Sequence, residues 1–63
     1  SAEILRNRDG RTIGTIETRS DRTQIIRNRD GRCLGEYDPR NNVTRDKDGR
    51  RVGEGNLLTA FLR

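Results

Sequence analysis

The chain has 63 residues, of which 38% are charged and 27% are hydrophobic, and its formal net charge is +4. A chain this short forms one domain at most, and so small an apolar share leaves a marginal core. One cysteine, Cys33, excludes an intramolecular disulfide, and the absence of histidine argues against a structural zinc site. We therefore expect the missing apolar surface to come from a second copy of the chain or from another protein, and a homo-oligomer is the leading inference.

The same composition bears on where the protein works. No apolar run approaches the roughly 20 residues of a membrane span, and nothing at the start resembles a signal peptide. A single free cysteine is compatible with a reducing compartment. We predict a cytoplasmic protein with no membrane partner.

One segment is written three times, at residues 4–14, 25–35 and 43–53. Each copy holds an aliphatic residue, then a glycine six residues later within Asp-Gly-Arg, and then a second aliphatic residue followed by another glycine. A disordered chain has no reason to keep these offsets, whereas a packed β-unit does. We predict a single all-β domain, 1–63, with approximate internal symmetry. Its β-hairpin units span about 4–17, 25–38 and 43–55, and its tail spans 56–63.

Each predicted turn opens with Asn or Asp and closes with glycine, as in Asn7-Arg8-Asp9-Gly10. The opening side chain can bond the backbone ahead of it, and the glycine accepts the left-handed conformation of a G1 bulge. A two-residue Asp-Gly turn is the alternative, and it would place Arg6 opposite Ile13.

The three-residue loop with a bulge is the register that we prefer, because it pairs like residues across the strands. It sets Leu5 opposite Ile13 and Arg6 opposite Thr12, with the same arrangement in the other two units. Gly14 then lies across from Ile4, where the missing side chain leaves room for the aliphatic group or for close backbone approach.

After Gly55 the pattern changes to a short tail, which follows a helical spacing with Asn56 as its cap. An extended strand is the alternative. Two turns of helix are not stable alone, so the tail must dock on its own sheet or on a neighbour's. The predicted oligomer interface is its apolar stripe of Leu57, Leu58, Phe61 and Leu62.

The recurring Asp-Gly-Arg unit with its following aliphatic residue and glycine resembles the small bacterial repeat proteins described as a four-fold β-flower, in which short hairpins are arranged as petals. The resemblance covers about residues 4–62 and implies a shape, with no activity, cofactor or functional residues. This chain shows three clear units, so the tail or a second chain would supply the fourth. Residues 49–55 are also similar to MORN repeats, and Tyr37-Asp38 to YD repeats, but both families place aromatic residues in each unit.

No residue pattern predicts catalysis. The absence of histidine removes the commonest general base. Cys33 stands where the other units have Thr12 and Arg51, which favours a small strand residue over a nucleophile activated by nearby arginines. Residues 46–49 share part of a calcium-loop pattern, but the first and twelfth ligand positions would be Thr44 and Gly55. We predict a non-enzymatic protein with no metal and no cofactor.

Thirteen of the fourteen cationic residues are arginine, which suits phosphate and carboxylate recognition. The candidate polyanion contacts share one face in the preferred register, and they are Arg6, Arg27, Arg45 and Arg51. Against this interpretation, each turn places an Asp beside its arginines, and the aromatic residues on which single-strand binders stack bases are missing. The predicted function is a self-associating structural or interaction module, with itself or another protein as partner. The alternative is an arginine-rich nucleic-acid-binding accessory protein.

Overall fold

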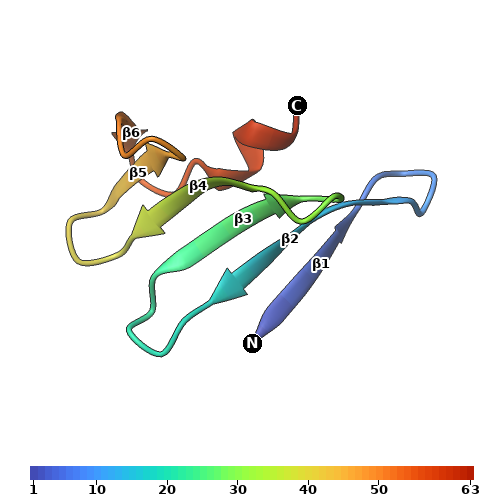
Figure 1. Ribbon diagram of the computed structural model, residues 1–63, viewed down its shortest axis with the longest axis horizontal. Coiled ribbons are helices and arrows are strands. Elements are labelled where there is room, and N and C mark those ends of the chain that lie inside the picture. Colours follow the sequence, from blue (N-terminus) through green and yellow to red (C-terminus); the bar gives the residue numbers. More distant parts are fainter.

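The computed structural model describes residues 1–63 as one antiparallel sheet of six strands with a short tail lying over it (Figure 1). The strands lie side by side in chain order, so β1 and β6 are the two edges of the sheet. The prediction of an all-β protein is confirmed. The strands are β1 (Ala2–Arg6), β2 (Thr12–Thr18), β3 (Gln24–Asn28), β4 (Cys33–Asp38), β5 (Val43–Asp46) and β6 (Arg51–Glu54).

The Asp-Gly-Arg turns follow β1, β3 and β5 and share one pattern of hydrogen bonds. In the first turn the Asn7 carbonyl accepts the N–H of Gly10 at 2.9 Å, and the Asn7 N–H donates to the Arg11 carbonyl at 2.9 Å. The Asn7 side chain accepts the N–H groups of Asp9 and Arg11 at 2.9 and 3.0 Å. Gly10 has a φ of +84°, as a G1 bulge requires. The same side-chain bonds recur at Asn28 and Asp46.

The strand register agrees with our expectation at the first pair beyond each turn and then departs from it. Arg6 pairs with Thr12 as expected, but Leu5 lies across from Gly14 and not from Ile13. The prediction for Leu5 was wrong because Ile13 is an extra residue on its strand, a second bulge that the pairing of like residues did not reveal. The same shift occurs at Ile26/Arg27 and at Thr44/Arg45.

The tail returns across its own sheet. Gly55, with a φ of +86°, turns the chain, and η1 (Leu58–Leu62) then contacts β3 and β4 (Figure 1). This element is a five-residue 3-10 helix, shorter than the two-turn helix that the apolar spacing predicted. Asn56 accepts the N–H of Leu58 at 3.2 Å. No helix in the structure has the length and apolar character needed to cross a bilayer.

The tail sits in three positions that glycine leaves open on the sheet. A Cβ on Gly35 would lie 2.5 Å from a ring carbon of Phe61, and a Cβ on Gly53 would lie 2.7 Å from Leu57. A Cβ on Gly14 would lie 3.1 Å from Leu62. The second glycine of each repeat therefore makes room for one apolar residue of the tail, and not for the aliphatic residue of its own unit. At Gly14 and Gly35 it also allows the close backbone approach that we expected, by the carbonyl groups of Arg27 and Arg45.

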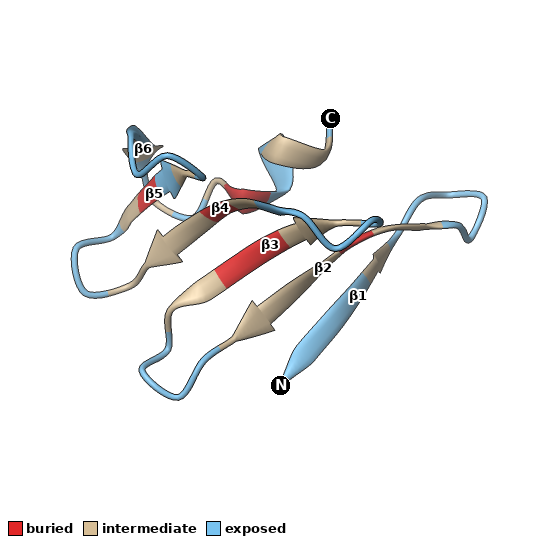
Figure 2. Ribbon diagram, viewed as in Figure 1, coloured by how far each residue is buried: buried red, intermediate tan, exposed pale blue.

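The core is small and lies between the middle of the sheet and the tail (Figure 2). Ile26 and Leu58 are the buried apolar side chains there, whereas Ile25, the neighbour of Ile26 on β3, is buried on the opposite face of the sheet. Thr44 is also fully buried, where its hydroxyl donates to the Gly55 carbonyl at 2.7 Å and accepts the Leu57 N–H at 3.0 Å. This hydroxyl ties the tail to β5 and pairs two backbone groups that lie partly out of water.

Candidate functional site

Three surfaces are candidates for function: the face of the sheet opposite the tail, the outer side of the tail, and the two free edges. We call the first the open face. Because side chains alternate between the faces of a strand, Arg27 and Arg45 lie on the open face, one residue away in register from the glycines that hold the tail. Arg6 and Arg51 share this face through their pairs with Thr12 and Arg45.

Three of these arginines brace the turns. The Nη1 groups of Arg6 and Arg27 each donate to the carbonyl of the turn glycine four residues later, both at 3.2 Å. Arg45 does the same with Gly49 at 3.3 Å. Sequence reasoning missed this role, although the constant four-residue spacing between arginine and glycine was its visible signal. Much of the arginine surplus on this face is therefore explained by turn geometry.

Carboxylates interleave with the arginines of the open face. Glu36 pairs directly with Arg45 across β4 and β5. A Glu17 oxygen lies 3.7 Å from the Arg27 Nη2, with both side chains more than a third exposed. One place departs from this alternation, because Arg45 also faces Arg51 directly. Two like charges opposite each other are unfavourable unless an anion joins them, so this pair is the best remaining polyanion contact.

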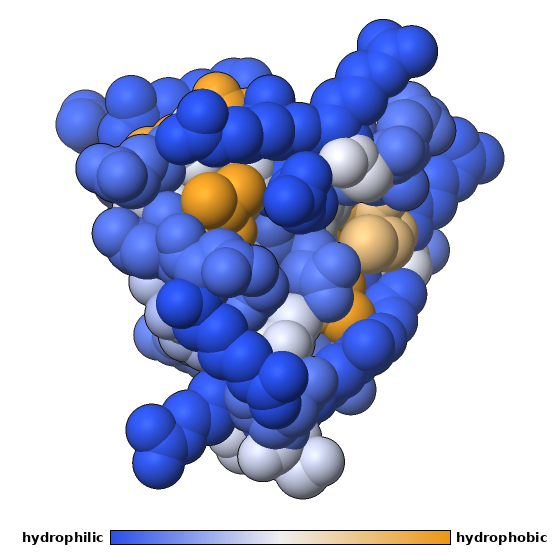
Figure 3. Space-filling model, turned by 90° about the vertical axis from the view of Figure 1, so that its left-hand side faces the viewer, coloured by the Kyte–Doolittle hydropathy of each residue, from blue (hydrophilic) through white to orange (hydrophobic).

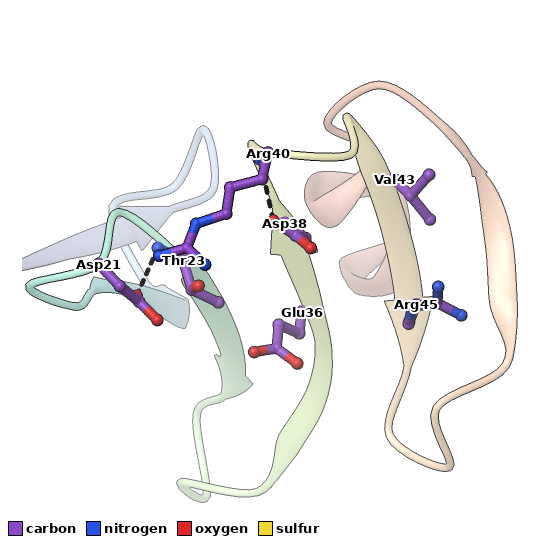
Figure 4. Close-up of a pocket in the computed structure, with 7 residues that line it drawn as sticks. All are labelled: Asp21, Thr23, Glu36, Asp38, Arg40, Val43 and Arg45. Atoms are coloured by element: carbon purple, nitrogen blue, oxygen red, sulfur yellow. Dashed lines mark hydrogen bonds between the residues drawn. The ribbon is translucent and has the colours of Figure 1, made fainter.

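A polar hollow of about 190 Å³ opens on the same face, between the β2–β3 connection and β5 (Figure 4). The Arg40 side chain extends across it toward Asp21 and Thr23 (Figure 4). The backbone N–H of Thr23 donates to the Asp21 carboxylate at 2.9 Å, and the backbone N–H of Arg40 donates to the Asp38 carboxylate at 2.9 Å. The hydrogen bonds from Thr23 hold the pKa of Asp21 below its ordinary value, with a further lowering by Arg40 and Arg19.

The lining of this hollow offers polar and charged contacts. Three carboxylates and two guanidinium groups nearly neutralise each other, and the residues are Asp21, Thr23, Glu36, Asp38, Arg40, Val43 and Arg45. Cys33 lies elsewhere, exposed on β4. No group of three potential metal-ligating side chains comes together in the structure.

The four tail residues predicted as an oligomer interface point mainly into their own chain. Leu58 is completely buried, so it contributes to the core. Phe61 and Leu62 are half-buried, and together with Ile13 and Leu34 they line a shallow hollow of about 410 Å³. Leu57 is also half-buried, against Gly53. The outer parts of these side chains are what remains available to a partner.

The free edges of the sheet were missed by the sequence reasoning, which did not fix the strand order. Ile4 on β1 is 54% exposed and Val52 on β6 is 47% exposed, and these are the two large apolar residues that lie exposed. Figure 3 views the end of the molecule that carries β5 and β6, and it shows small hydrophobic areas within a hydrophilic surface. A free edge also presents unpaired backbone N–H and carbonyl groups, which can pair with another strand.

Comparison with protein-family models, curated proteins and solved structures gives no match to this chain.

Proposed function

We propose that this protein is a non-enzymatic β-repeat module that functions by self-association in the cytoplasm. The resemblance of its three Asp-Gly-Arg units to those of the four-fold β-flower proteins supports a module built by repetition. The observation that carries the proposal is a sheet with two free edges, each with an exposed aliphatic residue. A chain with only three buried apolar side chains gains stability when those edges are covered.

The test is the mass of the intact chain in solution. Sedimentation equilibrium or light scattering over a wide range of protein concentration should give a mass above the 7.2 kDa of one chain. A mass that stays at 7.2 kDa throughout would contradict the proposal. Truncation after Gly55 is a poor test of assembly, because it also removes Leu58 from the core and should unfold the chain.

Binding to nucleic acid is the second candidate, and the facing pair Arg45–Arg51 is the observation that favours it. Titration of labelled DNA and RNA at two salt concentrations tests it, because phosphate contacts release counterions and weaken as salt rises. Arg51→Gln should weaken such binding without loss of a turn brace, whereas Arg63→Gln is a matched control that removes one charge from the tail. Absence of salt-sensitive binding at low salt would reject this candidate.

A further inference from the structure

The two places where one repeat unit meets the next use the same strand register. At the β2–β3 junction Gly14 faces Asn28, and at the β4–β5 junction Gly35 faces Asp46. One residue further on, the residue after the glycine faces the arginine of the next unit, as in the Glu36–Arg45 pair. The repeated residues thus specify the strand register between neighbouring units as well as the turn within each unit.

The two free edges carry the residues that this junction register requires. β6 ends with Gly53 and Glu54, and β1 ends with Arg6 followed by Asn7. Placed side by side in the same register, Gly53 faces Asn7 and Glu54 faces Arg6. The second pair repeats the opposite charges of Glu36 and Arg45, which favour this pairing over a shifted one.

The glycine at each junction admits a backbone carbonyl of the next unit. A Cβ on Gly14 would lie 2.5 Å from the Arg27 oxygen, and a Cβ on Gly35 would lie 2.8 Å from the Arg45 oxygen. Gly53 stands at the same repeat position on an edge strand, where a Cβ would have only Leu57 within 4 Å. The space beside Gly53 is therefore shaped for the carbonyl of an arginine equivalent to Arg27 and Arg45, which is Arg6.

The backbone of β1 also presents the correct groups. Ser1 and Thr18 exchange two hydrogen bonds, at 3.2 and 2.8 Å. Alternation along an antiparallel pair then directs the backbone N–H and carbonyl groups of Ile4 and Arg6 outward, to the free edge. Ile25, the equivalent of Ile4, has strands on both sides and is 4% exposed, against 54% for Ile4.

We propose that β6 of one copy pairs antiparallel with β1 of a second copy, with Glu54 facing Arg6. This proposal rests on self-association as the function and names the surface that performs it. The junction joins two different edges, so each copy uses both, and the assembly is a closed ring or an open filament. Because Gly55 turns the chain away after Glu54, the contact is short, and the association depends on protein concentration.

Disulfide trapping in a Cys33→Ser background tests the register. Two single-cysteine variants, Arg6→Cys and Glu54→Cys, are mixed and oxidised, and one carries a tag so that the mixed dimer has its own mass. Facing residues of this kind lie about 5.5 Å apart at Cα, within the range of a disulfide. The matched positive control is Glu36→Cys with Arg45→Cys, which should close within one chain.

The expected result is a mixed disulfide that forms faster than either self-disulfide and faster than one between Glu54→Cys and the turn variant Arg8→Cys. Rapid self-disulfides of Arg6→Cys would overturn the proposal in favour of β1 pairing with itself. Oligomers that give no mixed disulfide above the Arg8→Cys level would overturn this interface while the proposed function stands. A monomer at all concentrations would overturn both.

Charge reversal provides a second measurement that does not depend on disulfide geometry. Glu54→Arg should weaken the association by about two- to tenfold, because it replaces a favourable cross-strand charge pair with two like charges that face each other. The double variant Glu54→Arg with Arg6→Glu should recover the association. The double variant Glu54→Arg with Lys47→Glu, which changes a charge in an exposed turn, should not. Failure of the double variant to recover, when circular dichroism shows it folded, would overturn the Glu54–Arg6 register.

Discussion

The first and middle units of this protein use almost the same residues, yet they differ sharply in burial. Their turns have the same hydrogen bonds, and their bracing arginines reach the turn glycine at the same 3.2 Å. Ile25 and Ile26 are nevertheless 4% and 0% exposed, whereas Ile4 is 54% exposed and Leu5 is half-buried. The middle unit has strands on both sides and the tail above it, and the first unit lies at an edge. The same local sequence therefore forms the same turn, while position in the sheet decides its contribution to the core.

The largest loss of stability is expected at Ile26, the middle-unit equivalent of Leu5. Ile26→Ala should lower the free energy of unfolding by about 2–5 kcal/mol, because it opens a cavity in the only well-buried part of the core. Leu5→Ala should cost clearly less, since Leu5 keeps solvent access. Urea denaturation followed by circular dichroism at one fixed protein concentration measures both. Equal losses would show that the two positions contribute equally to the core despite their different burial.

The next effect concerns the glycines that receive the tail. Gly35→Ala should destabilise the fold by about 1–3 kcal/mol, because the new methyl group meets both Phe61 and a backbone carbonyl. Gly53→Ala should cost less, because its Cβ meets only the flexible end of Leu57. The same denaturation experiment compares the two losses of stability. A larger loss at Gly53 than at Gly35 would contradict the role that we assign to these glycines in receiving the tail.

The turn glycines of the first and middle units should respond alike to substitution. Gly10→Ala and Gly31→Ala both force a residue with a Cβ into a left-handed conformation, at φ values of +84° and +86°. Each should cost about 1–2 kcal/mol. Because both turns are open to solvent, the two losses should agree in spite of the unequal burial of their units. Losses that differ by more than the error of the measurement would mean that the turns are not equivalent.

The smallest effect belongs to Asp21, in a connection outside the repeated turns. Its folded-state pKa is lowered by hydrogen bonds from Thr23, so the unfolded chain takes up this proton first as the pH falls. Its contribution to stability is present above its ordinary pKa and is lost as the pH falls through the lowered value. Asp21→Asn should flatten the fall in thermal midpoint as the pH drops below the ordinary pKa of an aspartate, and Ser20→Ala should not.

The candidate sites divide into parts that sequence could and could not predict. The arginines of the open face were found from their repeated position, but their use as turn braces required the folded geometry. The apolar tail residues were found from their spacing, whereas only the structure shows Leu58 inside its own chain. The free edges have no sequence signal, because an edge strand such as β1 and an inner strand such as β3 have nearly the same sequence.

By itself, the sequence determined the all-β class and the Asp-Gly-Arg turns. Those turns depend on bonds between residues at most four positions apart, such as Asn7 and Arg11, so the residue types are sufficient to specify them. Tertiary structure decided the second bulge at Ile13, the docking of the tail on the glycines and the identity of the exposed aliphatic residues. Each of these depends on contacts between distant segments, as between Gly35 and Phe61, and local residue preferences do not determine which segments meet.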